Sequence, residues 1–171
     1  MRDRRYKKTE RKILSVFFGE ISKEISMKNL AEKAGIARST IYLHHHSLWQ
    51  IIPDCEKDIL EEYFEKIKRK LKDGTYIRKF YLDTLVFILK NREFFEVFLK
   101  FNNREVVIKM LSRLKEELRE PEKVFGIYIS EVTEVIFEWG HRGFPEGELE
   151  KVLADIMYLT NTMKERLGPL A

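Results

Sequence analysis

Three consecutive histidines, His44, His45 and His46, are the residues of this sequence with the most recognisable chemistry. Imidazole is the commonest protein ligand for zinc and its neighbours, so the run raises the hypothesis of a metal site. Successive residues of a helix point about 100° apart, however, so three adjacent side chains cannot converge on one ion. The sequence therefore predicts no bound metal. The alternative role for these side chains is a charge that titrates near neutral pH.

Catalytic chemistry has no recognisable arrangement in this chain. It contains no glycine-rich phosphate loop, and no serine or cysteine nucleophile stands in a known partner motif. The acidic pairs Glu61-Glu62 and Glu116-Glu117 lie in charged stretches with helical spacing, which indicates solvated surface. The single cysteine, Cys55, excludes an internal disulfide and fits a buried structural thiol. We therefore expect neither an enzyme nor a cofactor.

A second group of polar residues, Arg38, Ser39 and Thr40, opens a short segment with helical spacing that ends near His44. An arginine can form two hydrogen bonds to guanine, and hydroxyl groups can bond to bases or phosphates. Lys28 stands at the start of the preceding segment, where its charge and a helix N-terminus both favour a phosphate group. These residue types predict contacts with nucleic acid.

Two short helices must hold these side chains, and the sequence marks where the first begins and ends. Ser26 is a favourable N-cap, and Leu30, Ala31 and Ala34 give the helix one small apolar face. Gly35 ends it, because a residue without Cβ enters the left-handed conformation at little cost. Two helices joined by such a turn form a helix-turn-helix motif, whose second helix enters the major groove of DNA.

The sequence of residues 30–44, LAEKAGIARSTIYLH, resembles the DNA-binding signature of TetR-type transcriptional regulators. The resemblance implies that Tyr42 and His44 contact the sugar-phosphate backbone of DNA. The pattern departs from the family directly afterwards. His45 and His46 stand where an aromatic and a basic residue are usual, and the lysine that usually follows is absent.

The positive charge of the chain is concentrated at its N-terminal end. Residues 1–50 hold eleven Lys and Arg and five Asp and Glu, a net charge of +6; the net +4 of the chain leaves −2 for residues 51–171. Positive charge favours binding to DNA phosphates through the release of condensed counterions. This charge supports a helix-turn-helix DNA-binding domain at residues 1–50, and the resemblance implies a helical ligand-binding and dimerisation domain at residues 51–171.

The chain shows the apolar repeat of helices throughout, with only four Pro and eight Gly. We expect an all-α protein of about nine helices, a three-helix helix-turn-helix head followed by a C-terminal helical bundle. The first helix is expected from about Tyr6 to Ile21 and the fourth from Ser47 to Lys72, with a kink or a restart near Pro53. The bundle helices are expected at about 75–91, 93–101, 105–119, 121–141 and 146–167.

The predicted bundle is rich in aromatic residues, which line apolar ligand pockets as well as ordinary cores. The sequence favours neither interpretation over the other. The candidate lining residues of a pocket are Phe80, Tyr81, Phe87, Phe94, Phe98 and Met110. The resemblance to TetR-type regulators implies an apolar small-molecule effector in such a pocket.

The helix predicted at 121–141 carries apolar residues on two sides, which predicts one partner inside the chain and a second one outside it. The helix predicted at 146–167 carries a nearly continuous apolar stripe. By resemblance to the family, these two helices form a four-helix bundle with the same helices of a second subunit. The candidate residues of this homodimer interface are Val132, Ile136, Trp139, Val152, Ile156, Leu159 and Met163. Two symmetric heads would then bind a pseudo-palindromic operator in double-stranded DNA, with half-sites about 34–36 Å apart or a multiple of that spacing.

No apolar run approaches the length needed to cross a bilayer, and the N-terminus has no signal-type apolar core. We therefore expect a cytoplasmic protein without membrane contact. The resemblance implies a sequence-specific transcriptional regulator, with repression relieved by a small-molecule effector as the expected mechanism. The alternative is a protein-interaction module of the same fold that acts through a partner without binding DNA, which His45, His46 and Leu48 motivate.

Overall fold

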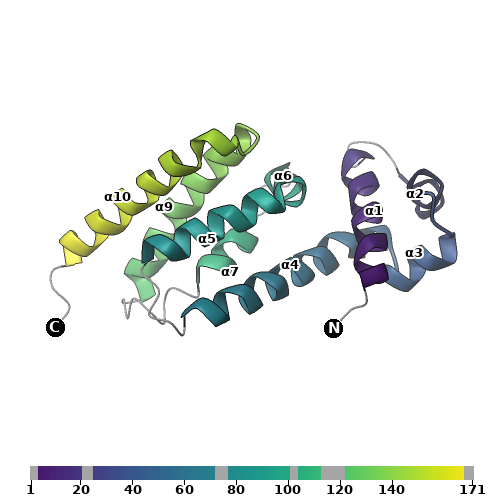
Figure 1. Cartoon of the computed structure of the whole chain (residues 1–171), viewed down its shortest axis with the longest axis horizontal. Coiled ribbons are helices and arrows are strands. Elements are labelled where there is room, and N and C mark those ends of the chain that lie inside the picture. Colours follow the sequence, from purple (N-terminus) through teal and green to yellow (C-terminus); the bar gives the residue numbers. More distant parts are fainter. Residues whose placement is uncertain (1–3, 21–24, 72–76, 101–103, 113–121, 168–171) are drawn as a thin grey trace. The chain divides into compact units, whose positions relative to one another are not determined.

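The computed structural model describes residues 4–20, 25–71, 77–100, 104–112 and 122–167 (Figure 1). All regular structure within these ranges is helical, so the expectation of an all-α protein is confirmed. The elements are α1 (Arg4–Glu20), α2 (Met27–Ala34), α3 (Arg38–His44), α4 (Leu48–Leu71), α5 (Ile77–Lys90), α6 (Arg92–Lys100), α7 (Glu105–Leu111), α9 (Glu122–His141), η1 (Glu146–Glu148, a 3₁₀ helix) and α10 (Leu149–Leu167). Among these, no helix has the length and apolar composition needed to span a membrane.

The chain divides into two compact units, Met1–Ile59 and Leu60–Ala171. The division falls within α4, so the first unit contains more of this helix than the head of residues 1–50 expected from the sequence. The expected helix ends at residues 21, 72, 75, 101, 119 and 121 lie outside the described ranges, as does the acidic pair at 116–117.

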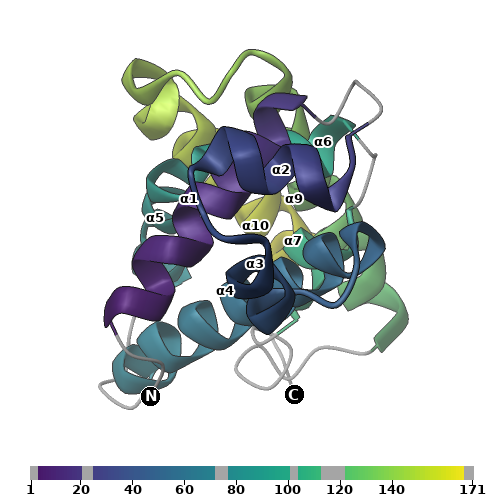
Figure 2. The same ribbon diagram turned by 90° about the vertical axis from the view of Figure 1, so that its right-hand side faces the viewer.

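The first unit is built on local signals at the ends of α2. The Ser26 hydroxyl accepts a hydrogen bond from the Asn29 backbone N–H at 3.1 Å, which caps the helix as expected. Gly35 has the left-handed conformation (φ 61°, ψ 40°) and ends the helix. After this turn α3 begins at Arg38, and its Ile41 side chain is fully buried. α1 packs against α2, and α2 packs against α3 (Figure 2).

Pro53 lies inside α4, which runs without interruption from Leu48 to Leu71. Of the two alternatives expected near Pro53, a kink or a restart, the restart is therefore wrong. Proline has no N–H to donate to the carbonyl four residues earlier, so one helical hydrogen bond is missing near the start of the helix. The Pro53 side chain is exposed, whereas Ile51 and Cys55 are buried. Burial of these two side chains offsets the cost of the proline, which is about 3 kcal/mol in a helix interior.

The second unit is a helical bundle in which α10 packs against α9 and α5, while α6 and α7 pack against α9 (Figure 1). A chain of buried hydroxyl groups joins three of these helices. Tyr81 of α5 is hydrogen-bonded to Tyr128 of α9, whose hydroxyl lies 2.6 Å from the Thr160 hydroxyl of α10. Thr160 also donates to the Ile156 carbonyl at 2.8 Å. The hydroxyls are thus satisfied inside the core, as buried polar groups must be.

A turn with two successive residues of positive φ, Gly143 (80°) and Phe144 (49°), closes the end of α9. The Gly143 N–H donates to the Gly140 carbonyl at 2.8 Å, and the Phe144 N–H donates to the Trp139 carbonyl at 3.2 Å. The Phe144 ring packs edge-on against the Trp139 ring, with 5.1 Å between the ring centroids. The Trp139 indole N–H donates to the Pro145 carbonyl at 3.1 Å. The helix break expected at residues 143–145 is therefore confirmed.

Candidate nucleic-acid interface

The outer face of α3 brings together most of the residues predicted to contact nucleic acid. Arg38, Ser39 and Tyr42 are exposed and Thr40 is half-buried, whereas Ile41 is buried on the inner side of the helix. The Arg38 guanidinium lies over the Tyr42 ring, with 5.8 Å between the guanidinium carbon and the ring centroid. One accessible surface thus presents a guanidinium group, two aliphatic hydroxyls and a phenol.

Lys28 lies on the first turn of α2 and is exposed. Its ammonium group is 3.9 Å from a carboxylate oxygen of Glu32, and both side chains are mostly exposed. An ion pair of this kind is screened by solvent and contributes little. Lys28 is therefore accessible to a phosphate group.

His44, which the resemblance assigns to the DNA backbone, points into the protein instead. Its side chain is only 5% exposed, and its Nδ1 atom pairs with a carboxylate oxygen of Glu10 on α1. In this arrangement the ring faces the interior of the first unit. The assignment of His44 as a backbone contact therefore does not fit its position.

His45 stands where TetR-type signatures carry an aromatic residue, and its side chain is fully buried. Its Nδ1 atom is hydrogen-bonded to Asp54 Oδ2 of α4 at 3.0 Å. Its Nε2 atom lies 2.8 Å from Glu10 Oε1, a close ion pair whose direction does not suit a hydrogen bond. Both ring nitrogens thus face carboxylates, which favours the doubly protonated, charged imidazolium. The ring links α1 to α4 inside the first unit.

Burial and charge act in opposite directions on this cluster. Burial by itself lowers the pKa of His45, but close contacts with the carboxylates of Glu10 and Asp54, together with their negative charges, outweigh it and raise this pKa. Burial by itself raises the pKa of Glu10, but the partner histidines outweigh it and lower this pKa. Burial, followed by the neighbouring carboxylates, raises the pKa of the Cys55 thiol, which is therefore neutral and unreactive at neutral pH. The cluster is an ion network without a nucleophile.

The three adjacent histidines do not converge on a common point. His44 and His45 face Glu10, while His46 is exposed. Within the described ranges, no group of three or more histidine, cysteine, aspartate or glutamate side chains is arranged to hold a metal ion. The nitrogen and oxygen atoms near His45 that could bind a metal contact one another instead, because the ring nitrogens face the carboxylates of Glu10 and Asp54.

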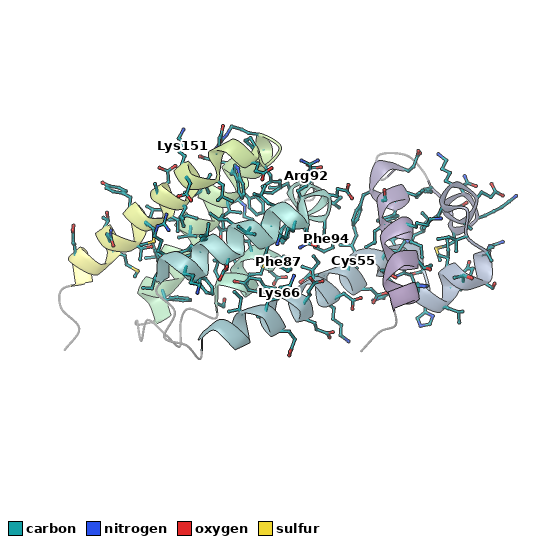
Figure 3. All side chains as sticks on the ribbon, in the orientation of Figure 1. Cys55, Lys66, Phe87, Arg92, Phe94 and Lys151 are labelled. Carbon is teal, nitrogen blue, oxygen red and sulfur yellow. The ribbon has the colours of Figure 1, made fainter. Side chains whose placement is uncertain are left out.

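The six candidates for a ligand pocket lie in the core of the second unit, and each is at most 6% exposed. They pack on one another and on their neighbours. The rings of Phe94 and Phe98 are 4.3 Å apart between centroids, and the Lys66 ammonium lies 4.8 Å from the Phe87 centroid (Figure 3). Two solvent-open hollows, of about 190 and 450 Å³, lie beside α10, and none of the six residues lines them. A ligand at the candidate residues would therefore require this core to open, and the pocket stays a prediction.

Most of the predicted dimer-interface residues are buried within a single chain. Those at most 1% exposed are Val132, Ile136, Trp139, Val152 and Ile156. Side chains buried in this way are not available to a second subunit, so the predicted face is wrong at these five positions. Among the described side chains of α9 and α10, the large apolar ones that are exposed are Ile127 at 60% and Tyr158 at 72%. Leu159 is half-buried beside Tyr158, in the wall of the smaller hollow.

Four residues outside the sequence-based candidates stand out in the first unit. Glu10 and Asp54 hold His45 from two different helices. Leu43 and Trp49 are apolar but 80% and 91% exposed. Leu43 follows the buried Ile41 by two residues, and residues two apart on a helix face different sides. The exposure of Leu43 could therefore have been predicted from helical spacing. Glu10 lies 34 residues before its partner His44, so no local pattern reveals that pair.

The outer face of α3 and the nearby Lys28 remain the described residues with the clearest chemical meaning, because their groups match the edges of bases and the phosphates of DNA. Comparisons of the chain with protein-family models, with curated proteins and with solved structures give no match.

Proposed function

We propose that this protein is a sequence-specific DNA-binding transcriptional regulator of the TetR type. The observation that carries the proposal is the arrangement of α2, the Gly35 turn and α3, with a polar outer face on the second helix. In a helix-turn-helix motif, the first residues of the second helix contact base edges in the major groove. Arg38, Ser39 and Thr40 are the first three residues of α3, which supports this role for them. The net charge of +6 on residues 1–50 supports binding to the phosphate backbone.

The proposal includes a homodimer that binds a pseudo-palindromic operator. Within the second unit α9 and α10 pack together, and they expose the large apolar side chains of Ile127 and Tyr158. Exposed apolar groups on long neighbouring helices are typical of helix–helix association. Twofold symmetry would present one α3 helix to each of two major grooves, about 34–36 Å apart or a multiple of that spacing.

Repression relieved by an effector is the proposed mode of regulation. The effector would be a small apolar molecule that inserts among the core aromatic residues of the second unit, Phe94 and Phe98 among them. Because these side chains are packed closely, the ligand-binding conformation would be a minor state that the effector makes dominant. A preference of about 1–3 kcal/mol for a state that does not fit the operator lowers DNA affinity about 5- to 150-fold.

A mobility-shift assay tests the proposal, with the purified protein and DNA fragments from upstream of its own gene, in the presence and absence of excess random DNA. Retention that survives the random DNA is the expected result. Arg38→Ala should then lower affinity for the retained fragment by about 1–3 kcal/mol and change affinity for random DNA much less. Lys28→Ala is the matched control, because loss of a phosphate contact weakens binding to both DNAs alike. Equal losses for Arg38→Ala on both DNAs would contradict base reading.

A second candidate function is a protein-interaction module of the same fold. The strong exposure of Leu43 and Trp49 favours it, because exposed apolar side chains are frequent at protein contact surfaces. Such a module would show no salt-dependent retention on DNA. A folded protein that no DNA fragment retains at low salt would decide in favour of this alternative.

A further inference from the structure

Leu43 adds an aliphatic group to the outer face of α3. It is 80% exposed, and it follows Ser39 by four residues and Thr40 by three. Residues at these separations lie on the same side of a helix, so Leu43 extends the surface of Ser39 and Thr40 by one turn. The buried side chain of the helix, Ile41, points to the other side. Leu43 thus lies among the proposed base contacts rather than in the core.

The charge around Leu43 indicates what kind of molecule covers it. Lys28, Lys33 and Arg38 are exposed on α2 and α3. Lys28 pairs with Glu32 and Lys33 with Glu20, and residues 1–50 as a whole keep a net charge of +6. A polyanion complements this surface and releases its counterions on binding. Duplex DNA is a polyanion that also offers apolar groups to a helix, because the methyl group of thymine projects into the major groove.

We infer that Leu43 recognises thymine, through contact between its side-chain methyl groups and the 5-methyl group of the base in the major groove. This inference rests on the proposed function, because it requires α3 to lie in that groove. Leucine has no side-chain donor or acceptor, so it distinguishes bases only by the apolar surface that they present. Thymine alone among the four bases presents a methyl group there. Each half-site of the operator therefore contains a thymine that Leu43 contacts.

The experiment starts from duplexes that the purified wild-type protein selects out of a pool with a randomised central segment. Thymidines of one selected duplex are then replaced one at a time by deoxyuridine, which removes only the methyl group. The wild type should lose about fourfold in affinity at one thymine of each half-site, the value of one buried methyl group. Leu43→Ala should bind the thymidine and deoxyuridine duplexes equally well.

Trp49→Ala is the matched control. Trp49 is also apolar and 91% exposed, but it belongs to the first turn of α4 rather than to α3. This variant should keep the fourfold difference between thymidine and deoxyuridine. Because the Leu43 side chain is exposed, Leu43→Ala should have the same Tm as the wild type. Thermal unfolding followed by circular dichroism checks this.

Two results would overturn the inference and leave the proposed function standing. One is a wild type that binds every deoxyuridine duplex as tightly as its thymidine parent. The other is a deoxyuridine effect that persists in Leu43→Ala, since another residue then contacts the methyl group. If the wild type selects no duplex from the pool, the proposed function fails, and the inference fails with it.

Discussion

His45 lies between Glu10 of α1 and Asp54 of α4, with its ring fully buried. An aromatic side chain at this place would contribute apolar burial that does not depend on pH. The histidine instead contributes a charge that needs both carboxylates. Removal of His45 takes one counter-charge from Glu10, whose side chain is only 12% exposed, and this is destabilising, whereas Asp54, 35% exposed, stays partly solvated. The packing of α1 and α4 in the first unit is therefore linked to the binding of a proton.

We expect the stability of the first unit to fall as the pH rises above 6.5. The folded-state pKa of His45 is raised from 6.5, so its contribution is complete below that pH and is lost as the pH rises through the raised pKa. The folded-state pKa of Glu10 is lowered from 4.5, so its contribution is present above that pH and is lost as the pH falls through the lowered pKa. Hydrogen exchange of the α2 and α3 amides, measured across this range, reports the opening of this unit.

The matched variants for this pH prediction are His45→Gln and His46→Gln. Glutamine at position 45 keeps a hydrogen-bonding group but does not titrate, so the loss of stability above pH 6.5 should disappear. This variant should also be less stable than the wild type by about 3 kcal/mol between pH 4.5 and pH 6.5, where the wild-type ion network is complete. The same change at the exposed His46 should leave the wild-type profile intact. If His45→Gln kept the wild-type dependence of stability on pH, a group other than His45 would be responsible for it.

At the scale of helices, Tyr63 and Thr84 connect α4 to α5 through a buried hydrogen bond of 2.8 Å between their hydroxyls. Thr84 also donates to the Phe80 carbonyl at 2.9 Å. Thr84→Val leaves the Tyr63 hydroxyl buried without this partner, which should lower the free energy of unfolding by about 1–3 kcal/mol. Tyr63→Phe removes the hydroxyl itself and should cost less, about 1 kcal/mol. Urea unfolding of both variants measures the difference, and a larger loss for Tyr63→Phe would contradict this account.

α9 contains two glycines in opposite surroundings, Gly126 and Gly140. A Cβ atom at Gly140 would lie 2.7 Å from Phe144 Cζ and would also clash with Leu99 Cδ1, so Gly140→Ala should destabilise the bundle by about 1–3 kcal/mol. A Cβ atom at Gly126 would meet nothing within 4 Å, so Gly126→Ala should stabilise the helix by up to about 1 kcal/mol. Thermal unfolding should therefore shift Tm in opposite directions. A rise in Tm for both variants would show that helix propensity governs both sites. A fall in Tm for both would show that packing governs both.

At the scale of the whole molecule, the exposed side chains of α9 and α10 predict how two chains associate. Ile127→Glu combined with Tyr158→Glu places carboxylates on the proposed interface, where their desolvation and mutual repulsion oppose association. We expect the dimer dissociation constant to rise at least about tenfold, with helicity unchanged because both side chains are exposed. Sedimentation velocity measures the dimer, with Trp49→Glu in the first unit as the control. A dimer unaffected by the double substitution would place the interface elsewhere.

The parts of the fold that follow from the sequence are those fixed by neighbouring residues. Ser26 and Gly35 act on the backbone beside them, so both ends of α2 could be predicted. The course of α4 at Pro53 could be predicted only as two alternatives, a kink or a restart, because the local rule for proline takes no account of the burial of Ile51 and Cys55 on either side of it. The structure has one helix there.

The same distinction applies to the candidate site and to the dimer face. The outer face of α3 follows from helical spacing, but the inward position of His44 depends on Glu10, 34 residues away. On α9, apolar residues occur on several sides, and periodicity does not tell which side faces the chain's own core. By periodicity alone Trp139 and Val132 are suited to contact a second subunit, although both are fully buried within one chain.

The two units satisfy their polar interiors by different means. The first unit uses ions around His45, whereas the bundle uses the neutral hydroxyl chain of Tyr81, Tyr128 and Thr160. Burial raises the pKa of both tyrosines, so these phenols keep their protons well beyond neutral pH. As the pH rises through the raised pKa of His45, the unit that carries α3 therefore loses the stability that this ion network contributes. The neutral hydroxyl chain of the bundle does not respond to that change, so the two units of one polypeptide differ in how their stability depends on pH.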